Sequence, residues 1–168
     1  GLLSMSKKIK TGDTENLEAQ AAAIYFPLVF GKSFNRRDDE DIRNALLNYG
    51  YSIIRGCVAR SIVGHGMLPQ FGIFHHSGLN AFNLADDLIE PYRQFVDVKV
   101  LEITSSYSCY TGKTIYPEDK AKLISILQED CILSEKRFII QMAIDMTTAS
   151  LKKVFYQYDD ELLLPSLP

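Results

Sequence analysis

An apolar stripe of helical period between residues 42 and 57 limits the possible folds of this chain more than any other feature. Its members recur at steps of four, three, four and four residues: Ile42, Leu46, Tyr49, Ile53 and Cys57. This is the spacing of one face of an α-helix, so the segment predicts a long amphipathic helix that packs against a core. Strand-like alternation is scarce in the rest of the chain. The sequence therefore predicts an all-α domain.

Capping and turn residues divide the chain into five predicted helices. Thr14 and either Asp38 or Asp39 can cap the first two helices, Gly31 ends the first, and Pro117 suits the first turn of the fourth. The predicted helices occupy about residues 15–30, 40–63, 80–96, 117–128 and 135–157.

Length and composition fit one helical domain. The 168 residues, 46% hydrophobic and 23% charged, can build a substantial core. We expect the domain to span residues 1–168, with 1–13 as a frayed N-terminal segment and 159–168 as a C-terminal tail. No apolar run approaches the ~20 residues that span a membrane, and no signal peptide is visible, so a cytoplasmic location is expected. Gly1 resembles the scar of a cleaved tag, which suggests a part of a longer protein.

Glu18 is a carboxylate on the apolar face of the first predicted helix. At helical spacing its neighbours are Ala21, Ala22, Tyr25 and Val29, and the two alanines leave space beside it. Burial of an unpaired carboxylate is costly, so a bound cation is a natural partner. The alternative is a solvated glutamate in the first helical turn, where the helix dipole favours negative charge.

His75 ends a regular string of loop residues. Gly66, Pro69, Gly72 and His75 follow one another at steps of three, which predicts a loop of defined path that brings the imidazole to one point. Histidine is the commonest metal ligand and also serves as a general base. The neighbouring His76 is a competing ligand, and an ordinary hydrogen-bonded loop histidine is the simpler alternative.

Two polar rows each allow two interpretations. The row on the third predicted helix is typical of a solvated face, and it comprises Asn83, Asp86, Glu90, Arg93 and Asp97. Asp87 shares this ambiguity. The row on the second predicted helix either lines a site that touches phosphate or is the wet side of that helix, and it comprises Asn44, Asn48, Tyr51 and Arg55.

Four blocks of residues stand in order between positions 18 and 97. They are Glu18, Ala21, Ala22, Tyr25, Phe26, Phe30, Gly31, Phe34 and Arg36; Asn44, Ala45, Leu47, Asn48, Tyr49, Gly50 and Tyr51; Gly66, Pro69, Gly72 and His75; and Phe82, Asn83, Leu84, Ala85, Asp87, Leu88, Glu90, Pro91, Arg93 and Asp97. In this order and separation they resemble the CRISPR-associated integrase family that inserts new spacers. The last block, with Glu90 before Pro91 and Arg93, most resembles the branch found in type II systems.

The resemblance implies that Glu18, His75 and Glu90 are the catalytic residues and bind a metal ion, Mg²⁺ or Mn²⁺. Two carboxylates and an imidazole suit such a hard divalent ion. The resemblance further implies a transesterification, in which the 3′-hydroxyl of spacer DNA attacks a phosphodiester at the CRISPR repeat. Arg55 and Arg93 are our candidates for contacts with DNA phosphates.

The same resemblance implies partners. Family members carry an N-terminal β domain that helps dimerisation, so a homodimer is expected of the full-length protein. Nothing in this chain resembles that β domain. Family members act on double-stranded DNA together with a small dimeric partner subunit. The net charge of −3 suggests that this chain alone binds duplex DNA weakly. A metal-dependent phosphohydrolase and a non-catalytic helical interaction module are the rival functions.

Overall fold

Helices make up most of the computed structural model, which describes residues 17–105, 114–158 and 161–168. The helices are α2 (Leu17–Phe30), α3 (Ile42–Gly64), α4 (Asn83–Ile89), α5 (Arg93–Ser105), α6 (Pro117–Ser125) and α7 (Ile140–Phe155), with 3₁₀ turns η1 (Glu90–Tyr92) and η2 (Ile126–Gln128). A two-stranded antiparallel hairpin of β1 (Asp130–Leu133) and β2 (Lys136–Ile139) is the only sheet within these described ranges. The predicted all-α class is confirmed.

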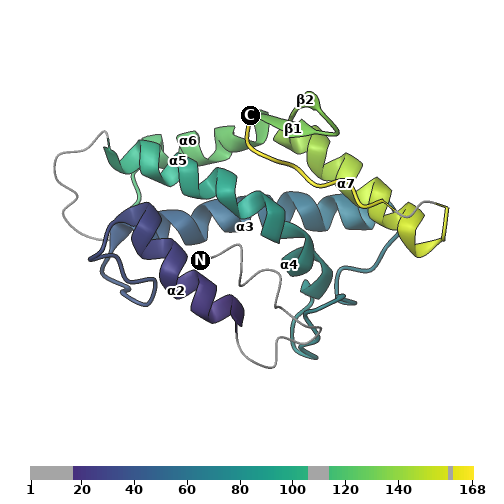
Figure 1. The fold of residues 1–168 in the computed structure, drawn as a ribbon, viewed down its shortest axis with the longest axis horizontal. Helices are drawn as coiled ribbons and strands as arrows, with labels where there is room; N and C mark the ends of the chain where they lie inside the picture. The colour runs from purple at the N-terminus through teal and green to yellow at the C-terminus, as the bar shows by residue number, and fades with distance from the viewer. Residues whose placement is uncertain (1–16, 106–113, 159–160) are drawn as a thin grey trace.

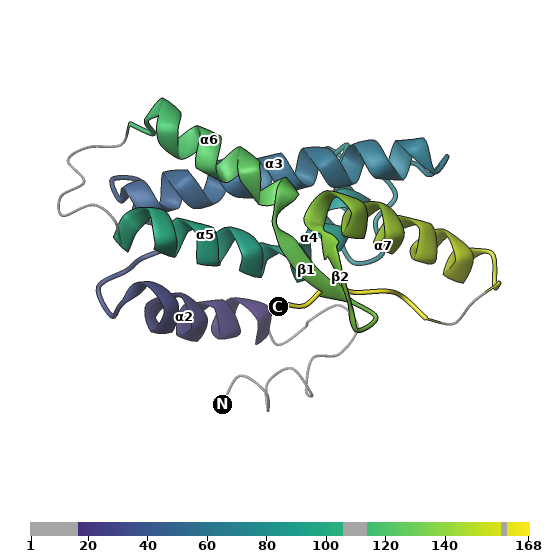
Figure 2. The ribbon, with the colours of Figure 1, turned by 90° about the horizontal axis from the view of Figure 1, so that it is seen from above.

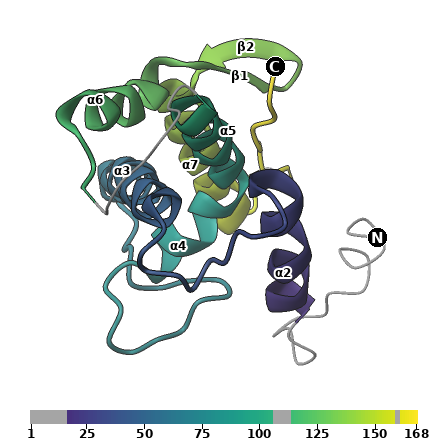
Figure 3. The ribbon, with the colours of Figure 1, turned by 90° about the vertical axis from the view of Figure 1, so that its left-hand side faces the viewer.

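Helix α3 is the central element of the fold (Figure 1). Helices α4, α5, α6 and α7 all pack against it. Because α3 has neighbours on several sides, Leu47 and Ile54 are as deeply buried as Leu46, although they lie outside the predicted stripe. Seen from above, α5 lies between α3 and α2 (Figure 2), and the end-on view agrees (Figure 3). The core therefore surrounds α3, and α2 lies at the periphery of the domain, on the far side of α5 from α3.

The C-terminal end of α3 directs the chain into a long loop, residues 66–82. The amide of Met67 donates to the carbonyl of Ile62 at 3.0 Å, and that of Gly66 donates to Val63 at 2.9 Å. Together with the positive φ of 74° at Gly66, these bonds form a Schellman motif. The cap residue itself is His65, whose ring lies 2.9 Å from Asp145 of α7.

Two predicted helix boundaries in the first half of the chain are wrong. The second helix does not start at Asp38 or Asp39, because Asp41 is its cap and accepts the amide of Arg43 at 2.9 Å. The third predicted helix, about 80–96, is instead α4, η1 and α5, which continue to Ser105. Pro91 lies in the 3₁₀ turn between the two helices, because proline has no amide hydrogen to continue the α-helical ladder.

The start of the last predicted helix, about residue 135, is also wrong. Ser134 and Glu135 have φ values of 49° and 63°, which suit the two-residue turn of a hairpin. Cys131 and Leu133 alternate with partly exposed neighbours and enter the core, so this short segment follows the period of a strand. Helix α7 begins only at Ile140.

The C-terminal segment packs back onto the domain. Ser166 and Ile132 exchange two backbone hydrogen bonds of 2.9 Å, and the amide of Leu163 donates to the Ser150 hydroxyl. Cys57 and Cys131 are buried free thiols. The predicted frayed segment 1–13, the proposed cap Thr14 and Cys109 lie outside the described residues. Among those that are described, no helix is long and apolar enough to cross a membrane.

Candidate active site

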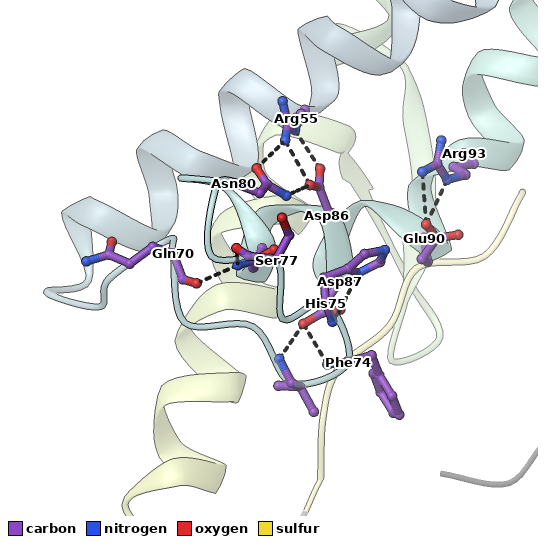
Figure 4. A network of polar contacts seen from close by, with 12 residues as sticks. Arg55, Gln70, Phe74, His75, Ser77, Asn80, Asp86, Asp87, Glu90 and Arg93 are labelled. Carbon is purple, nitrogen blue, oxygen red and sulfur yellow. Dashed lines mark hydrogen bonds and ion pairs between the residues drawn. The ribbon is translucent and has the colours of Figure 1, made fainter. Parts of the chain in front are cut away.

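Helix α4 holds the loop of residues 66–82, here called the His75 loop, through polar side chains (Figure 4). The buried Asn83 donates from Nδ2 to the carbonyls of Gln70 and Ser77, both at 2.9 Å. One turn later, Asp87 accepts hydrogen bonds from the middle of the same loop. The loop lacks regular secondary structure, so these side-chain bonds replace the backbone ladder that would otherwise fix its path.

Asp87 makes four polar contacts with the His75 loop, three of them as the acceptor of backbone amides. Its carboxylate receives the amides of Ile73, of Phe74 at 3.1 Å and of His75 at 3.1 Å. It also contacts the ring Nδ1 of His75 at 2.6 Å. The Asp87 side chain is 4% exposed, whereas that of His75 is 48% exposed. The imidazole of His75 is thus half exposed to solvent, while its Nδ1 contacts the buried carboxylate of Asp87.

Gly72 permits the close approach of this loop to α4. A Cβ atom at this position would collide with the backbone carbonyl of His75 and would lie 2.9 Å from Asn83 and from Asp87. Two of these neighbours are the side chains that hold the loop. The regular string of glycine and proline in the sequence therefore has a steric cause at this position.

Gly72→Ala should displace the His75 loop, whereas Gly78→Ala in the same loop should not. A Cβ at Gly78 meets nothing within 4 Å, which makes it a matched control. Because the loop can move away from α4 while the core around α3 stays intact, Gly72→Ala should cost only about 1–3 kcal/mol of unfolding free energy. The amide resonances of residues 73–75 in an NMR spectrum should shift widely in Gly72→Ala and little in Gly78→Ala. Similar spectra of the two variants would contradict the steric account.

Arg55 of α3 contacts the C-terminal end of the His75 loop. Its guanidinium forms two hydrogen bonds with Asp86, of 2.5 and 2.8 Å, and a third with Asn80 at 3.1 Å. It also lies 4.7 Å above the ring of Phe82. Burial alone would raise the pKa of Asp86, but the bonds from Arg55 and Asn80 hold that pKa below its usual value. Contact of Arg55 with DNA phosphate stays a prediction, and this ion pair competes with it.

A pocket of about 440 Å³ opens between α2, α3 and the η1–α5 segment. Its lining combines small, aromatic and charged side chains: Ala21, Ala22, Tyr25, Phe26, Tyr51, Glu90, Pro91, Arg93, Gln94 and Asp97. Glu90 is exposed at the rim, where its Oε1 accepts a hydrogen bond of 2.9 Å from Nε of Arg93 and forms an ion pair with Nη2 of Arg93, also at 2.9 Å (Figure 4). Glu18 lies on α2 one turn before Ala21 and Ala22, but its side chain is outside the described residues. The pocket therefore lies between α2, the helix that carries Glu18, and η1, the turn that carries Glu90.

Asp97 forms the floor of this pocket and is almost fully buried. Its carboxylate accepts the hydroxyls of Tyr25 at 2.7 Å and Tyr51 at 2.5 Å. Burial raises the pKa of Asp97, although the two tyrosines and the nearby Arg93 and Arg36 oppose that rise. Burial and the adjacent carboxylate likewise raise the pKa of both phenols. Asp97 thus ties α2 and α3 to α5 under the pocket.

Burial separates the alternatives for the two polar rows. Asn83 and Asp97 are buried, so the row that includes Glu90 is not simply a solvated face, although Glu90 itself is exposed. Asn44 and Tyr51 are also buried, so the second row is not the wet side of α3. Tyr51 lines the pocket, and the ring of Tyr51 lies 4.7 Å below the guanidinium of Arg93.

The structure brings part of the predicted ligand set together. His75 binds Asp87, which precedes Glu90 by one turn of the same helical segment. His75 is not among the described residues that line the pocket. In the described part of the chain, no three His, Cys, Asp or Glu side chains are grouped closely enough to hold a metal. The convergence of Glu18, His75 and Glu90 therefore stays a prediction, since one of the three side chains is not described.

Comparisons with known proteins identify the family. A family model described as CRISPR associated protein Cas1 matches residues 4–123. The chain belongs to the Cas1 family. Among curated Cas1 proteins, the CRISPR-associated endonuclease Cas1 of Neisseria meningitidis serogroup C is 40% identical over 149 residues, which cover 89% of this chain and 48% of that protein. The Cas1 of Francisella tularensis subsp. novicida is 30% identical over 140 residues, covering 77% and 43%.

The chain spans about half the length of these curated Cas1 relatives. A solved structure described as a casposase bound to integration product has a similar fold, with a TM-score of 0.75 at 21% sequence identity. The similarity covers 91% of this chain and 52% of the casposase chain. The pocket described above thus lies in a Cas1 domain whose helical arrangement recurs in the casposase.

Proposed function

We propose that the complete protein joins the 3′ ends of spacer DNA to a CRISPR repeat by metal-dependent transesterification. The single observation that supports this proposal most is that Asp87, which holds His75, lies one helical turn before Glu90, which lines an open pocket, in a chain of the Cas1 family. The casposase, a fold relative, was captured with an integration product. Curated Cas1 relatives are named endonucleases, which supports the same class of reaction at DNA phosphodiesters.

The side chains present fit a hard divalent ion, Mg²⁺ or Mn²⁺. Within the described residues, Nε2 of His75 has no hydrogen-bond partner, and Glu90 uses only Oε1 to bind Arg93. Nε2 of His75 and Oε2 of Glu90 are therefore both open to a ligand. With Glu18 they would supply two oxygens and one nitrogen. When bound, the ion would polarise a phosphoryl oxygen and stabilise the charge that develops there.

Arg93 is the residue that we assign to the DNA phosphate. It is half-buried beside Glu90, lies over the ring of Tyr51 and lines the pocket. A guanidinium in this position can turn from the Glu90 carboxylate to a phosphate oxygen, since both are anionic acceptors. Further cations must come from elsewhere, because the chain has a net charge of −3. A homodimer and a small dimeric partner subunit complete the proposed assembly on double-stranded DNA in the cytoplasm.

Strand transfer by the complete protein and its partner subunit tests this proposal. A labelled donor DNA with a 3′-hydroxyl should join to a repeat-containing duplex, and the same donor with a 3′-deoxy end should not, because the attacking oxygen is missing. Chelation of divalent ions should stop the reaction. Glu90→Gln should reduce the rate by roughly a hundredfold or more, because a neutral amide is a poor ligand for a hard cation.

Glu118→Gln provides the matched control, since Glu118 is exposed on α6 and lines no described pocket. It should transfer strands at the wild-type rate. If the target duplex is cut equally with either donor and no joined product forms, the protein is a metal-dependent phosphohydrolase. If Glu90→Gln and Glu118→Gln are equally active, the proposed role of Glu90 is wrong.

A further inference from the structure

Four hydrogen bonds from one loop converge on the carboxylate of Asp87, a residue that the proposed chemistry does not use. Oδ2 accepts the amides of Ile73 and Phe74, and Oδ1 accepts the amide of His75. Oδ1 also lies 2.6 Å from Nδ1 of the His75 ring. The other ring nitrogen, Nε2, lies on the opposite side of the imidazole and is not engaged by any described residue. The ring is thus held at one nitrogen only.

The chemistry of this carboxylate determines which ring nitrogen carries the proton. Backbone amides can only donate, so Asp87 must act as their acceptor. An ionised carboxylate has no hydrogen of its own, so its contact with Nδ1 is a hydrogen bond only if Nδ1 carries the proton. In a neutral imidazole the lone pair then belongs to Nε2. Free imidazole side chains in water favour the reverse arrangement, with the proton on Nε2.

We propose that Asp87 is a positioning residue that keeps His75 in the Nδ1-protonated tautomer and directs Nε2 outward as the metal-binding atom. The inference rests on the proposed function in one respect, the assignment of His75 as a ligand. A histidine that binds a metal through one nitrogen commonly donates the other N–H to a carboxylate, which fixes both tautomer and ring direction. Asp87 adds a second constraint, because the same carboxylate also holds the backbone of residues 73–75.

The tautomer can be measured in the metal-free chain by two-bond ¹⁵N–¹H NMR of the imidazoles, with His75→Ala for assignment. At about pH 8 histidine side chains are generally neutral, so the two tautomers are distinguishable. We expect Nδ1 of His75 to be protonated in the wild-type chain. In Asp87→Asn the amide can donate to Nδ1, so the proton of His75 should move to Nε2. A wild-type His75 with its proton on Nε2 would overturn the proposal without any variant.

Asn83→Ala is the control for a merely structural role of Asp87. It removes two further hydrogen bonds between α4 and the His75 loop, those to the carbonyls of Gln70 and Ser77, and leaves the Asp87 carboxylate in place. The loop should become looser, but His75 should keep its proton on Nδ1. If Asn83→Ala changes the tautomer as much as Asp87→Asn does, Asp87 has no specific role.

Binding of Mn²⁺ to the complete protein provides a second measurement. Loss of a carboxylate that supports a ligating histidine typically weakens metal affinity by about 10–100-fold. We expect such a loss in Asp87→Asn and a clearly smaller one in Asn83→Ala, which loosens the loop but keeps the Asp87 carboxylate. Equal affinities in all three proteins would overturn the assignment of Nε2 as the ligand atom. An Nδ1-protonated His75 in a protein that transfers no DNA strands would instead contradict the proposed function and leave the tautomer assignment intact.

Discussion

His75→Ala should abolish strand transfer by the complete protein while the helical core stays folded. His75 lies in a loop and its side chain is half exposed, so its removal leaves no cavity in the core around α3. The proposed reaction would lose one ligand and with it much of the charge stabilisation at phosphorus. The loss of one such group typically costs about 3 kcal/mol or more, which is over a hundredfold in rate. Strand-transfer rates and thermal unfolding of the same samples test both parts.

His76→Ala is the control, because it removes an adjacent, exposed imidazole that forms no hydrogen bond or ion pair with the described residues. It should melt and react like the wild-type protein. If His76→Ala abolishes strand transfer and His75→Ala does not, the assignment of the ligand within the loop is wrong by one residue. If both variants are fully active and folded, neither histidine is a metal ligand in the reaction and the proposed metal site is wrong.

The helical period of α3 could be predicted because long amphipathic helices carry a regular signal over many turns. Leu46 and Cys57 confirm that signal through their burial. The hairpin of β1 and β2 could not be predicted in the same way, since a strand of four residues contains only two inward positions. Its turn residues, Ser134 and Glu135, adopt positive φ values without the Asn-Gly pattern that normally marks such turns.

The candidate site was visible in the sequence only in part. Gly72 and His75 indicated a loop of fixed path, and the structure supplies the steric reason at Gly72. The role of Asp87 was not recognised, because helical periodicity places it on α4 but gives no sign of the loop that folds back onto it. The spacing of three residues between Asp87 and Glu90 was the one available signal, since it sets both carboxylates on successive turns.

The buried cluster around Asp97 shows why polar periodicity alone misleads. Asp97 falls in one row with Glu90 and Arg93, which is the pattern of a solvated face. The tyrosines that bury and pair it come from α2 and α3, 72 and 46 residues away in sequence. No local pattern reports a contact at that separation. The burial of Asp97 is therefore a property of the tertiary fold.

Asp97→Ala should be the most destabilising single substitution at the pocket. It removes both tyrosine hydrogen bonds at once and leaves the hydroxyls of Tyr25 and Tyr51 without their acceptor. An unpaired buried hydroxyl costs about 1–3 kcal/mol, and this applies in full to Tyr51 and less to the part-buried Tyr25, so we expect a loss of about 2–4 kcal/mol in unfolding free energy. Urea denaturation measures this loss. Asp130→Ala, at an exposed carboxylate with a 3.4 Å contact to Arg137, should change stability by less than about 1 kcal/mol.

A comparison of wild type with Asp97→Asn at two pH values tests whether burial or the nearby arginines dominate the pKa of Asp97. Because burial raises the pKa of Asp97 above 3.8, the folded state holds its proton more tightly than the unfolded state does. The contribution of Asp97 to the unfolding free energy is therefore complete below about pH 3.8, the pKa of the unfolded state, and is lost as the pH rises through the pKa of the folded state. Asn does not titrate, so wild type should exceed Asp97→Asn in stability by more at about pH 4 than at about pH 7. A difference that instead grows with pH would show that Arg36 and Arg93 outweigh burial, and that Asp97 serves the fold as a fully ionised group.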